Sequence, residues 1–310
     1  MGPLRLPLRR GSEAVIEVEG LRKSYDGVVA VAGIDLSVKA GEVFALLGPN
    51  GAGKTTTVEI LEGYRRQDSG VVRVLGADPR RAPAAWRDRI GIVLQQSGIE
   101  KELTVREAIT RLARVYSRPA DVAATIDRVG LTEKADARIK TLSGGQRRRV
   151  DMAAAIIGRP ELIFLDEPTT GFDPAARREA WRLVAELAAD GATVILTTHY
   201  LDEAQQLADR VAVIAGGRIV AEGDPSTLGG REQRLARIRF RTPPVSLPPE
   251  LRQLVSIELN GWTEMIDEAA VSALHALTGW ALEHDVALDG LEVIRPSLED
   301  VYLELAGETP

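Results

Sequence analysis

The clearest chemistry in the sequence lies in a glycine-rich segment that follows a short apolar run. Residues 48–55 fit the pattern G-x-x-x-x-G-K-[ST], and the apolar run 43–47 before them predicts a buried strand. Small residues in such a loop allow backbone N–H groups to face phosphate oxygens, and the helix that follows adds the positive end of its dipole. We therefore predict a phosphate-binding loop made of Gly48, Pro49, Asn50, Gly51, Ala52, Gly53, Lys54, Thr55 and Thr56.

Two side chains of this loop carry groups that a nucleoside triphosphate requires. Lys54 is expected to reach the β and γ phosphates, and the Thr55 hydroxyl is expected to coordinate Mg²⁺. A flexible glycine turn could satisfy the pattern by itself, but the strand before it favours a phosphate loop. ATP and Mg²⁺ are thus the predicted ligands.

A second apolar run ends in two adjacent carboxylates. Residues 162–165 predict a buried strand, and Asp166 and Glu167 follow it directly. Asp166 suits a place in the Mg²⁺ shell, and Glu167 suits the residue that orients and polarises an attacking water. The alternative is a strand end whose acids face solvent. The phosphate loop upstream favours a centre of ATP hydrolysis.

The elements that must position these residues alternate between apolar runs and helical patterns. The runs 43–47, 162–165 and 193–197 are apolar on both faces, which is typical of parallel strands covered by helices. Three helices are expected: one after the capping box Thr104 to Glu107 with Ile109, Leu112 and Val115 on one face, one from Ser143 to Gly158, and one with Asp173 as N-cap and Pro174 next.

The pentapeptide 142–146, Leu-Ser-Gly-Gly-Gln, lies shortly before these carboxylates, with Ser143 placed 23 residues before Asp166. With the phosphate loop, the two carboxylates and this pentapeptide together, residues 15–226 resemble the ATP-binding subunits of ABC transporters. The resemblance implies an α/β P-loop NTPase fold with a helical subdomain. It also implies that ATP is held between two such subunits, with the phosphate loop of one facing Ser143, Gly144, Gly145 and Gln146 of the other.

The same resemblance gives roles to four residues outside the two motifs. Tyr25 resembles the aromatic that stacks on adenine, although an ordinary strand tyrosine is the alternative. Gln95 resembles the glutamine that senses Mg²⁺ and water and couples to the membrane partner. His199 resembles the histidine that contacts the γ-phosphate. Asp173 resembles the aspartate that communicates across the dimer, and it can cap its helix as well.

Composition excludes several other classes of protein. The 310 residues carry a net charge of −6 and contain no cysteine, which excludes a disulfide framework, a thiolate metal site and a thiol nucleophile. The acidic balance argues against direct nucleic-acid binding. No apolar run approaches the length of about 20 residues that a membrane-spanning helix needs. The resemblance to ABC transporter subunits then implies a peripheral protein at the cytoplasmic face of the membrane.

The chain is expected to divide into three parts: a flexible N-terminus (1–14), a nucleotide-binding domain (15–230) and a C-terminal accessory or assembly domain (231–310). The last part holds 14 acidic and 7 basic residues and is broken by prolines at its start. A small α+β domain is predicted there, with strands at 237–241, 256–259 and 291–294, a helix bearing Val271, Leu274, Leu277 and Ala281 on one face, and a last helix at 298–305.

Two segments and a run of arginines resemble one subgroup of the family. Residues 169–171 and 296–302, together with the arginines that follow the pentapeptide, resemble the ABC-2 exporter group that includes daunorubicin-resistance ATPases. The sequence departs from common family patterns at Phe172, where leucine is frequent, and at Arg148, where many importer ATPases have glutamine. The resemblance implies a homodimer that drives a separate ABC-2-type permease and exports a drug-like or lipophilic compound.

Two alternatives stay open at this point. One is a soluble ABC ATPase that remodels a nucleic-acid or ribosome complex, although such chains usually carry two nucleotide-binding domains and this one has a single signature. The other is an importer ATPase with a regulatory tail. Neither the cargo nor the identity of the permease can be read from the residues.

Overall fold

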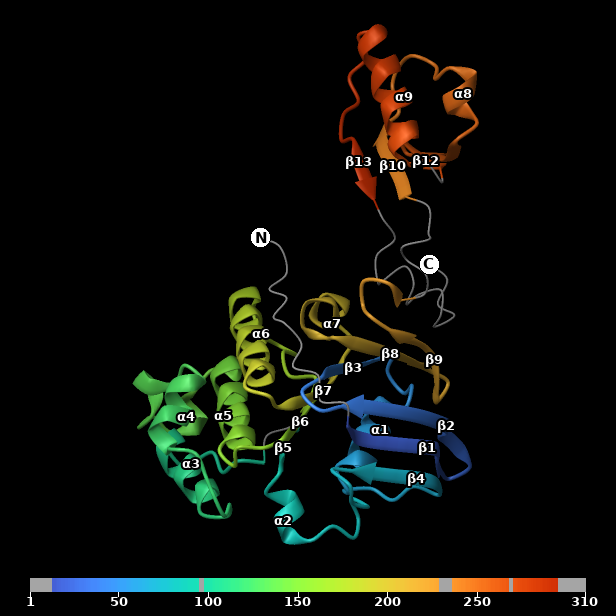
Figure 1. Ribbon diagram of the computed structural model, residues 1–310. Coiled ribbons are helices and arrows are strands. Elements are labelled where there is room, and N and C mark those ends of the chain that lie inside the picture. The colour runs from blue at the N-terminus through green and yellow to red at the C-terminus, as the bar shows by residue number, and fades with distance from the viewer. Residues whose placement is uncertain (1–12, 95–97, 229–235, 268–269, 295–310) are drawn as a thin grey trace. The chain divides into compact units, whose positions relative to one another are not determined.

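The computed structural model of the chain describes residues 13–94, 98–228, 236–267 and 270–294 (Figure 1). The chain divides into two compact units, Met1–Pro225 and Ser226–Pro310, where the sequence suggested a boundary near residue 230. None of the helices in the described ranges has both the length and the apolar character needed to cross a bilayer.

The first unit is built around a six-stranded sheet. Its strand order is β5-β6-β7-β3-β8-β9, and every neighbouring pair is parallel except β8 and β9. Strands β3 and β7 are buried along their whole length, as expected for strands covered by helices. The strand bounds are β5 (Ile90–Val93), β6 (Leu162–Asp166), β7 (Thr193–Thr198), β3 (Val43–Leu47), β8 (Arg210–Ala215) and β9 (Arg218–Gly223).

The order of three central strands places the predicted motifs together. Strand β7 lies between β6 and β3, and all three run in the same direction. In the register of the sheet Leu47 pairs with Thr198, and Asp166 pairs with Thr197. Since the carboxyl ends of these strands meet at one edge, the loops that follow them share one region of the surface.

A second, antiparallel sheet packs on the first through a shared core. It consists of β2 (Val28–Lys39), β1 (Ala14–Tyr25) and β4 (Ser69–Val74), in that order. Helix α1 (Lys54–Leu61) contacts both β2 and β4. One continuous cluster of buried apolar side chains joins strands of both sheets and α1, and it includes Ile16, Phe44 and Ile60.

Helices α3, α4 and α5, drawn in green in Figure 1, contact one another, and α5 lies against β5. The predicted capping box is present, because Glu107 N–H donates to Thr104 Oγ1 and the Thr104 N–H donates to the Glu107 carboxylate. The predicted apolar stripe is wrong at Val115, which lies beyond the end of α3 and is 74% exposed. The helices are α2 (Ala84–Arg87), α3 (Val105–Ala113), α4 (Val122–Arg128) and α5 (Gly144–Ile156), with 3₁₀ turns at Thr132–Lys134 and Ile139–Thr141.

Two further helices complete the first unit, α6 (Pro174–Ala189) and α7 (Leu201–Leu207). Helix α6 begins as predicted, with Asp173 as N-cap and a proline in its first turn. The predicted helix from Ser143 to Gly158 is also present, although α5 ends at Ile156. Both helices therefore begin where short polar caps in the sequence indicate.

The second unit is a four-stranded antiparallel sheet, in the order β11-β12-β10-β13, with two helices. Its core includes Phe240, Met265, Leu277 and Trp280. The predicted helical stripe is wrong at Val271, which is 84% exposed, and the helix predicted at 298–305 lies outside the described residues. The elements are β10 (Ala236–Arg241), α8 (Pro249–Arg252), β11 (Val255–Leu259), β12 (Trp262–Asp267), α9 (Ala270–Glu283) and β13 (Glu292–Ile294).

Candidate nucleotide site

The glycine-rich loop joins β3 to α1 and is crowded by backbone from other elements. A Cβ on Gly53, whose φ is +104°, would lie 2.3 Å from the Ala30 carbonyl oxygen. A Cβ on Gly48 would lie 2.4 Å from the Ile214 carbonyl oxygen. Only glycine fits at these two positions, so the loop keeps a shape in which its backbone can approach a ligand closely.

Lys54, the first residue of α1, is buried with 6% of its surface exposed. Its ammonium donates to the carbonyl oxygens of Gly48 (2.7 Å) and Pro49 (3.1 Å). Burial lowers the pKa of Lys54, and the nearby carboxylates of Glu167 and Asp166 oppose that shift. The lysine is therefore a desolvated cation between the phosphate loop and the two predicted acids.

The two acids sit at the end of β6 and are fixed by the neighbouring strand. The Thr197 hydroxyl on β7 donates to Asp166 Oδ1 and accepts from the Glu167 N–H at 3.1 Å. Glu167 has a φ of +46°, in the left-handed region that residues with a Cβ rarely adopt. The chain thus turns sharply at Glu167, and Thr197 holds both acids at this turn.

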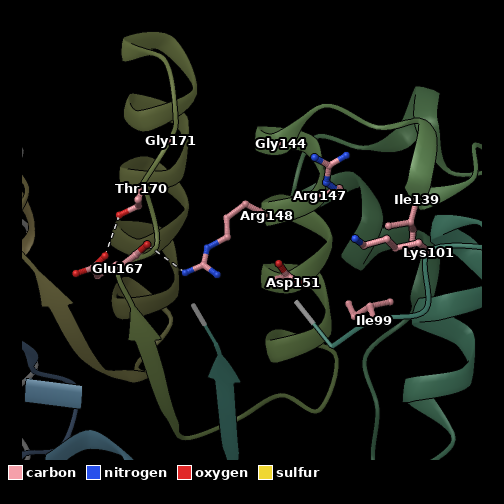
Figure 2. Close-up of a pocket in the computed structure, with 10 residues that line it drawn as sticks. All are labelled: Ile99, Lys101, Ile139, Gly144, Arg147, Arg148, Asp151, Glu167, Thr170 and Gly171. Atoms are coloured by element: carbon pink, nitrogen blue, oxygen red, sulfur yellow. Dashed lines mark hydrogen bonds between the residues drawn. The ribbon is translucent and has the colours of Figure 1, made fainter. Parts of the chain in front are cut away.

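The Glu167 side chain contacts two other polar groups. Its Oε1 lies 3.3 Å from His199 Nδ1. Its Oε2 accepts from the Thr170 hydroxyl at 3.3 Å, a contact that Figure 2 shows. The Glu167 side chain is 15% exposed, whereas that of His199 is 42% exposed. The structure therefore brings together two residues that are 32 positions apart and that the sequence predicted to share one site.

The pentapeptide forms the N-terminus of α5. Ser143 caps the helix by accepting from the Gln146 N–H, and the Gln146 side chain accepts from the Ser143 N–H in return. The proton of the Ser143 hydroxyl stays available for donation because the hydroxyl acts as an acceptor in this cap. A Cβ on Gly144 would meet open space. The N-terminus of α5 is thus accessible to a ligand.

A pocket of about 460 Å³ lies in front of this helix terminus (Figure 2). Gly144 and Arg148 of α5 line one part of it, and Glu167, Thr170 and Gly171 line another. Among the described residues, those that line the pocket include none from the phosphate loop 48–56. Within one chain, therefore, the helix terminus and Glu167 share a pocket without the phosphate loop.

Tyr25 lies at the end of β1 between two cations. Lys23 Nζ is 5.2 Å from the centre of the Tyr25 ring, and the guanidinium carbon of Arg65 is 5.4 Å from it. Arg65 also pairs with Glu59 of α1. The ring is thus anchored near α1, the helix that begins at the phosphate loop.

The remaining predicted site residues are Asp173 and Gln95. Asp173 Oδ1 accepts from the backbone N–H groups of Ala175 (2.9 Å) and Ala176 (2.8 Å), so its observed contacts are those of a helix cap. Gln95 lies outside the described residues.

Two acids near the site, one buried and one half-buried, were not foreseen from the sequence. Glu203 of α7 is fully buried, and its Oε1 accepts from the Thr169 hydroxyl (2.9 Å) and from the Trp181 indole N–H (3.0 Å). Burial raises the pKa of Glu203, while its hydrogen bonds oppose that shift. Glu203 thereby joins α6 and α7 to the loop after β6. No local pattern reveals this, because both partners come from distant parts of the chain.

The second unforeseen acid, Glu62, follows α1. Burial, assisted by the charges of Asp166 and Glu59, raises the pKa of Glu62 to about 8. Between pH 4.5 and 8 the folded protein holds a proton that the unfolded chain releases, so stability falls as the pH rises through this window. Glu62→Gln removes this titration, so the variant should be more stable than the parent at pH 8. The gain in the free energy of unfolding is about 1.4 kcal/mol for each unit by which folding raises the pKa of Glu62.

Urea unfolding of the nucleotide-free protein in EDTA, at pH 5 and pH 8, measures this effect. The exchange of the exposed Glu17 for glutamine is the matched control and should leave the pH dependence unchanged. Parallel pH profiles for Glu62→Gln and the parent would show that the Glu62 carboxyl does not titrate in this window.

Comparison with known proteins identifies relatives over nearly the whole chain. The family model described as ABC transporter matches residues 31–170. The daunorubicin/doxorubicin resistance ATP-binding protein DrrA of Streptomyces peucetius is 41% identical over 308 residues, which cover 94% of this chain and 92% of that protein. The Nod factor export ATP-binding protein I of Paraburkholderia xenovorans is 40% identical over 304 residues, which cover 95% and 98% of the two chains.

Solved structures with the same fold cover about two thirds of the chain. The protein cbiO1 from Clostridium perfringens, part of the ABC transporter complex cbiONQ, is 31% identical with a TM-score of 0.63, and the match covers 69% of this chain and 89% of that one. A dimeric ATP-binding cassette in a post-hydrolysis state with bound ADP and phosphate is 25% identical with a TM-score of 0.62, covering 67% and 98%.

These similarities confirm the fold predicted from the sequence, an α/β P-loop NTPase with a helical part. In the structure the loop 48–56, the acids after β6 and His199 after β7 follow neighbouring strands at one edge of the sheet. The chain belongs to the ABC transporter family, in which it is an ATP-binding subunit that hydrolyses ATP.

Proposed function

We propose that this ATPase binds Mg-ATP between two copies of the chain and drives a separate ABC-2-type permease at the cytoplasmic face of the membrane. The observation that carries the proposal is the convergence of Lys54, Asp166, Glu167 and His199 at one edge of the sheet. The relatives named for drug resistance and for Nod factor export match the chain over nearly its full length. Export of a drug-like or lipophilic compound is therefore the proposed direction and class of cargo.

Nucleotide binding follows from the contacts of the phosphate loop. The Lys54 ammonium donates to two loop carbonyls, and the β and γ phosphates of a bound nucleotide would replace them as acceptors. The backbone N–H groups of residues 50–56, which include the N-terminus of α1, supply the other donors. Tyr25 offers a ring, already flanked by cations, on which adenine can stack.

The oxygen donors at the end of β6 and at the start of α1 fit Mg²⁺. Asp166 supplies one carboxylate and Thr55 an exposed hydroxyl, and both are the oxygen ligands that Mg²⁺ prefers. Mg²⁺ commonly binds through one or two such groups together with phosphate oxygens and water. When bound, the ion would neutralise charge on the phosphates. Gln95 is the further ligand suggested by the family resemblance.

Hydrolysis is assigned to Glu167, with His199 beside it. In ATP hydrolysis water attacks the γ-phosphorus, the bond to the oxygen of ADP breaks, and phosphate and ADP leave. The Glu167 carboxylate would accept a hydrogen bond from that water and draw its proton away from the attacking oxygen. His199 Nδ1 and the Thr170 hydroxyl, each 3.3 Å from Glu167, hold the carboxylate in place.

A second chain would complete the site. Ser143, Gly144, Gly145 and Gln146 present a helix N-terminus that suits the γ-phosphate of ATP bound to the other subunit. Two observations support this head-to-tail arrangement. The described residues that line the pocket at Gly144 include none from the phosphate loop of the same chain. A related cassette is dimeric in its solved structure. Asp173, near this surface, is proposed to contact the partner.

Purification from mild detergent tests the link to transport. We expect the chain to copurify with a permease that spans the membrane several times, and the ATPase activity to rise in that complex. A matched sample of Arg111→Gln, which alters an exposed ion pair on α3, should behave like the parent. Copurification of ribosomes or DNA in place of a membrane protein would contradict the proposal.

The second unit is proposed to act in assembly and not in phosphate chemistry. All predicted nucleotide-site residues lie before residue 226, and the acidic balance of the tail disfavours an anionic ligand. A chain that ends after Gly230 should keep its nucleotide affinity within a few fold, while transport by the complex falls sharply. Fluorescent-ATP binding and transport are measured on the same truncated protein. If the truncated protein folds but loses its nucleotide affinity, the second unit takes part in nucleotide binding and the proposal is wrong. If transport is unchanged, the second unit has a structural role and no role in assembly.

A further inference from the structure

A buried arginine on α5 donates its hydrogen bonds to backbone carbonyls of the turn that bears Glu167. Arg148 lies five residues after the helix cap Ser143 and is 8% exposed. Its guanidinium donates to four backbone carbonyl oxygens: Leu94, Asp166 (2.5 Å), Glu167 (3.1 Å) and Pro168 (3.2 Å). A charged side chain is costly to bury unless its donors are satisfied, and these carbonyls accept from four of the five guanidinium N–H groups.

Three of these carbonyls belong to consecutive residues at the end of β6. Nη2 donates to both Asp166 and Glu167, and Nε donates to Pro168. Carbonyl oxygens that converge on one point repel one another, and the guanidinium removes that repulsion. The middle residue, Glu167, is the one whose φ of +46° is unfavourable for a residue with a Cβ. Arg148 therefore stabilises the strained turn that directs the Glu167 side chain toward His199.

The fourth carbonyl belongs to a different loop. Leu94 follows β5 and directly precedes Gln95, and its oxygen accepts from Arg148 Nη1. In Figure 2 the Arg148 side chain extends from α5 toward the turn at Glu167. One guanidinium thus joins three parts of the site: the helix that begins at Ser143, the segment before Gln95 and the turn that bears Glu167.

We propose that Arg148 is a positioning residue for hydrolysis, which holds the Glu167 turn in its reactive geometry and transmits the position of α5 to that turn. This inference rests on the proposed role of Glu167 and extends it to a residue whose hydrogen bonds go to backbone carbonyls of the turn and of Leu94. A planar group with five donors in a fixed fork can serve four carbonyls at once, whereas a lysine or glutamine cannot.

The expected result is a change in the rate of hydrolysis and not in ATP affinity. Arg148→Gln should lower kcat by about 10- to 100-fold, since small displacements of a catalytic group cost rates of this size. The Kd for Mg-ATP should stay within about threefold, because Lys54 and Tyr25 are untouched. Arg148→Lys keeps the charge and should give an intermediate kcat. Arg149→Gln, the same exchange one residue further along α5 at an arginine that pairs with Glu179, is the matched control.

A double-variant comparison separates positioning from a general loss of structure. In the Glu167→Gln background the carboxylate is already missing, so adding Arg148→Gln should change the residual single-turnover rate by less than about twofold. Thermal unfolding of each variant reports on folding, and Arg148→Lys carries the same test if Arg148→Gln does not fold. If Arg148→Gln lowers the rate equally in both backgrounds, or weakens ATP binding as much as it slows turnover, the positioning role is wrong. Normal hydrolysis by Glu167→Gln alone would instead overturn the proposed role of Glu167.

Discussion

Replacement of Glu167 by glutamine is expected to reduce ATP turnover by about 100- to 10,000-fold, while Mg-ATP still binds. Lys54, Thr55 and Asp166 keep their contacts in this variant, whereas the amide can no longer draw a proton from the attacking water. Phosphate release and equilibrium nucleotide binding measure the two effects separately. The loss should appear in kcat and leave the Kd within a few fold, because the carboxylate acts on water and not on the bound phosphates.

The same exchange at the opposite end of the strand provides the control. Glu161 precedes β6, is exposed and pairs with Arg89, so Glu161→Gln should hydrolyse ATP at the parent rate. Substantial turnover by Glu167→Gln would show that another group orients the water. A parallel loss of ATP affinity would show that Glu167 belongs to the binding contacts.

Mixing two inactive variants should restore activity. Lys54→Ala removes the phosphate-loop cation, and Ser143→Arg places a large cation where α5 is capped. If ATP lies between two chains, a mixed dimer pairs the intact phosphate loop of the second variant with the intact Ser143 segment of the first. Random pairing at equal concentrations then gives about a quarter of the parental sites, since half of the dimers carry one intact site of two.

Steady-state ATPase activity of the mixture, compared with each variant alone, measures this recovery. Arg147→Ala mixed with Lys54→Ala is a useful comparison, because it changes the same helix without changing the cap. A Ser143→Arg mixture that is no more active than either parent variant would contradict a site shared between chains.

The parts of the fold that the sequence predicted are those specified by local chemistry. Strands β3, β6 and β7 could be predicted because parallel strands buried on both faces leave continuous apolar runs. The starts of α3 and α6 could be predicted because capping side chains are local signals. Val115 and Val271 were assigned to buried faces wrongly, because periodicity alone does not show where a helix ends or which of its turns meets a partner.

Strand β12 was missed although the sequence contains a signal for it. Asn260 and Gly261 both have positive φ, at +53° and +74°, and they join β11 to β12 as a two-residue hairpin turn. An Asn-Gly pair is a strong hairpin signal, but Thr263 in the buried face of β12 weakens the apolar alternation that would have supported it. The Asn-Gly turn could therefore have been recognised, but the polar Thr263 hid the strand that follows it.

The site also contains residues that the sequence predicted and residues that it did not. The phosphate loop and the acids after β6 were predicted because each follows an apolar strand in a short motif, whereas the role of His199 was implied by the family resemblance. Arg148 was noted only as a departure from related sequences. Its role depends on carbonyl groups, one of them 54 residues away, and backbone acceptors leave no trace in residue types. Glu203 escaped notice because its side-chain partners Thr169 and Trp181 are 34 and 22 residues away.

The central claim is that two chains enclose ATP, and the mass of the Glu167→Gln protein tests it most directly. Light scattering is recorded with and without saturating Mg-ATP. Because the variant is expected to bind ATP without releasing it as product, the enclosed dimer should accumulate. The account predicts a mass of twice the 33.5 kDa chain with Mg-ATP and a monomer without it. A protein that binds Mg-ATP to saturation and still scatters as a monomer would contradict it.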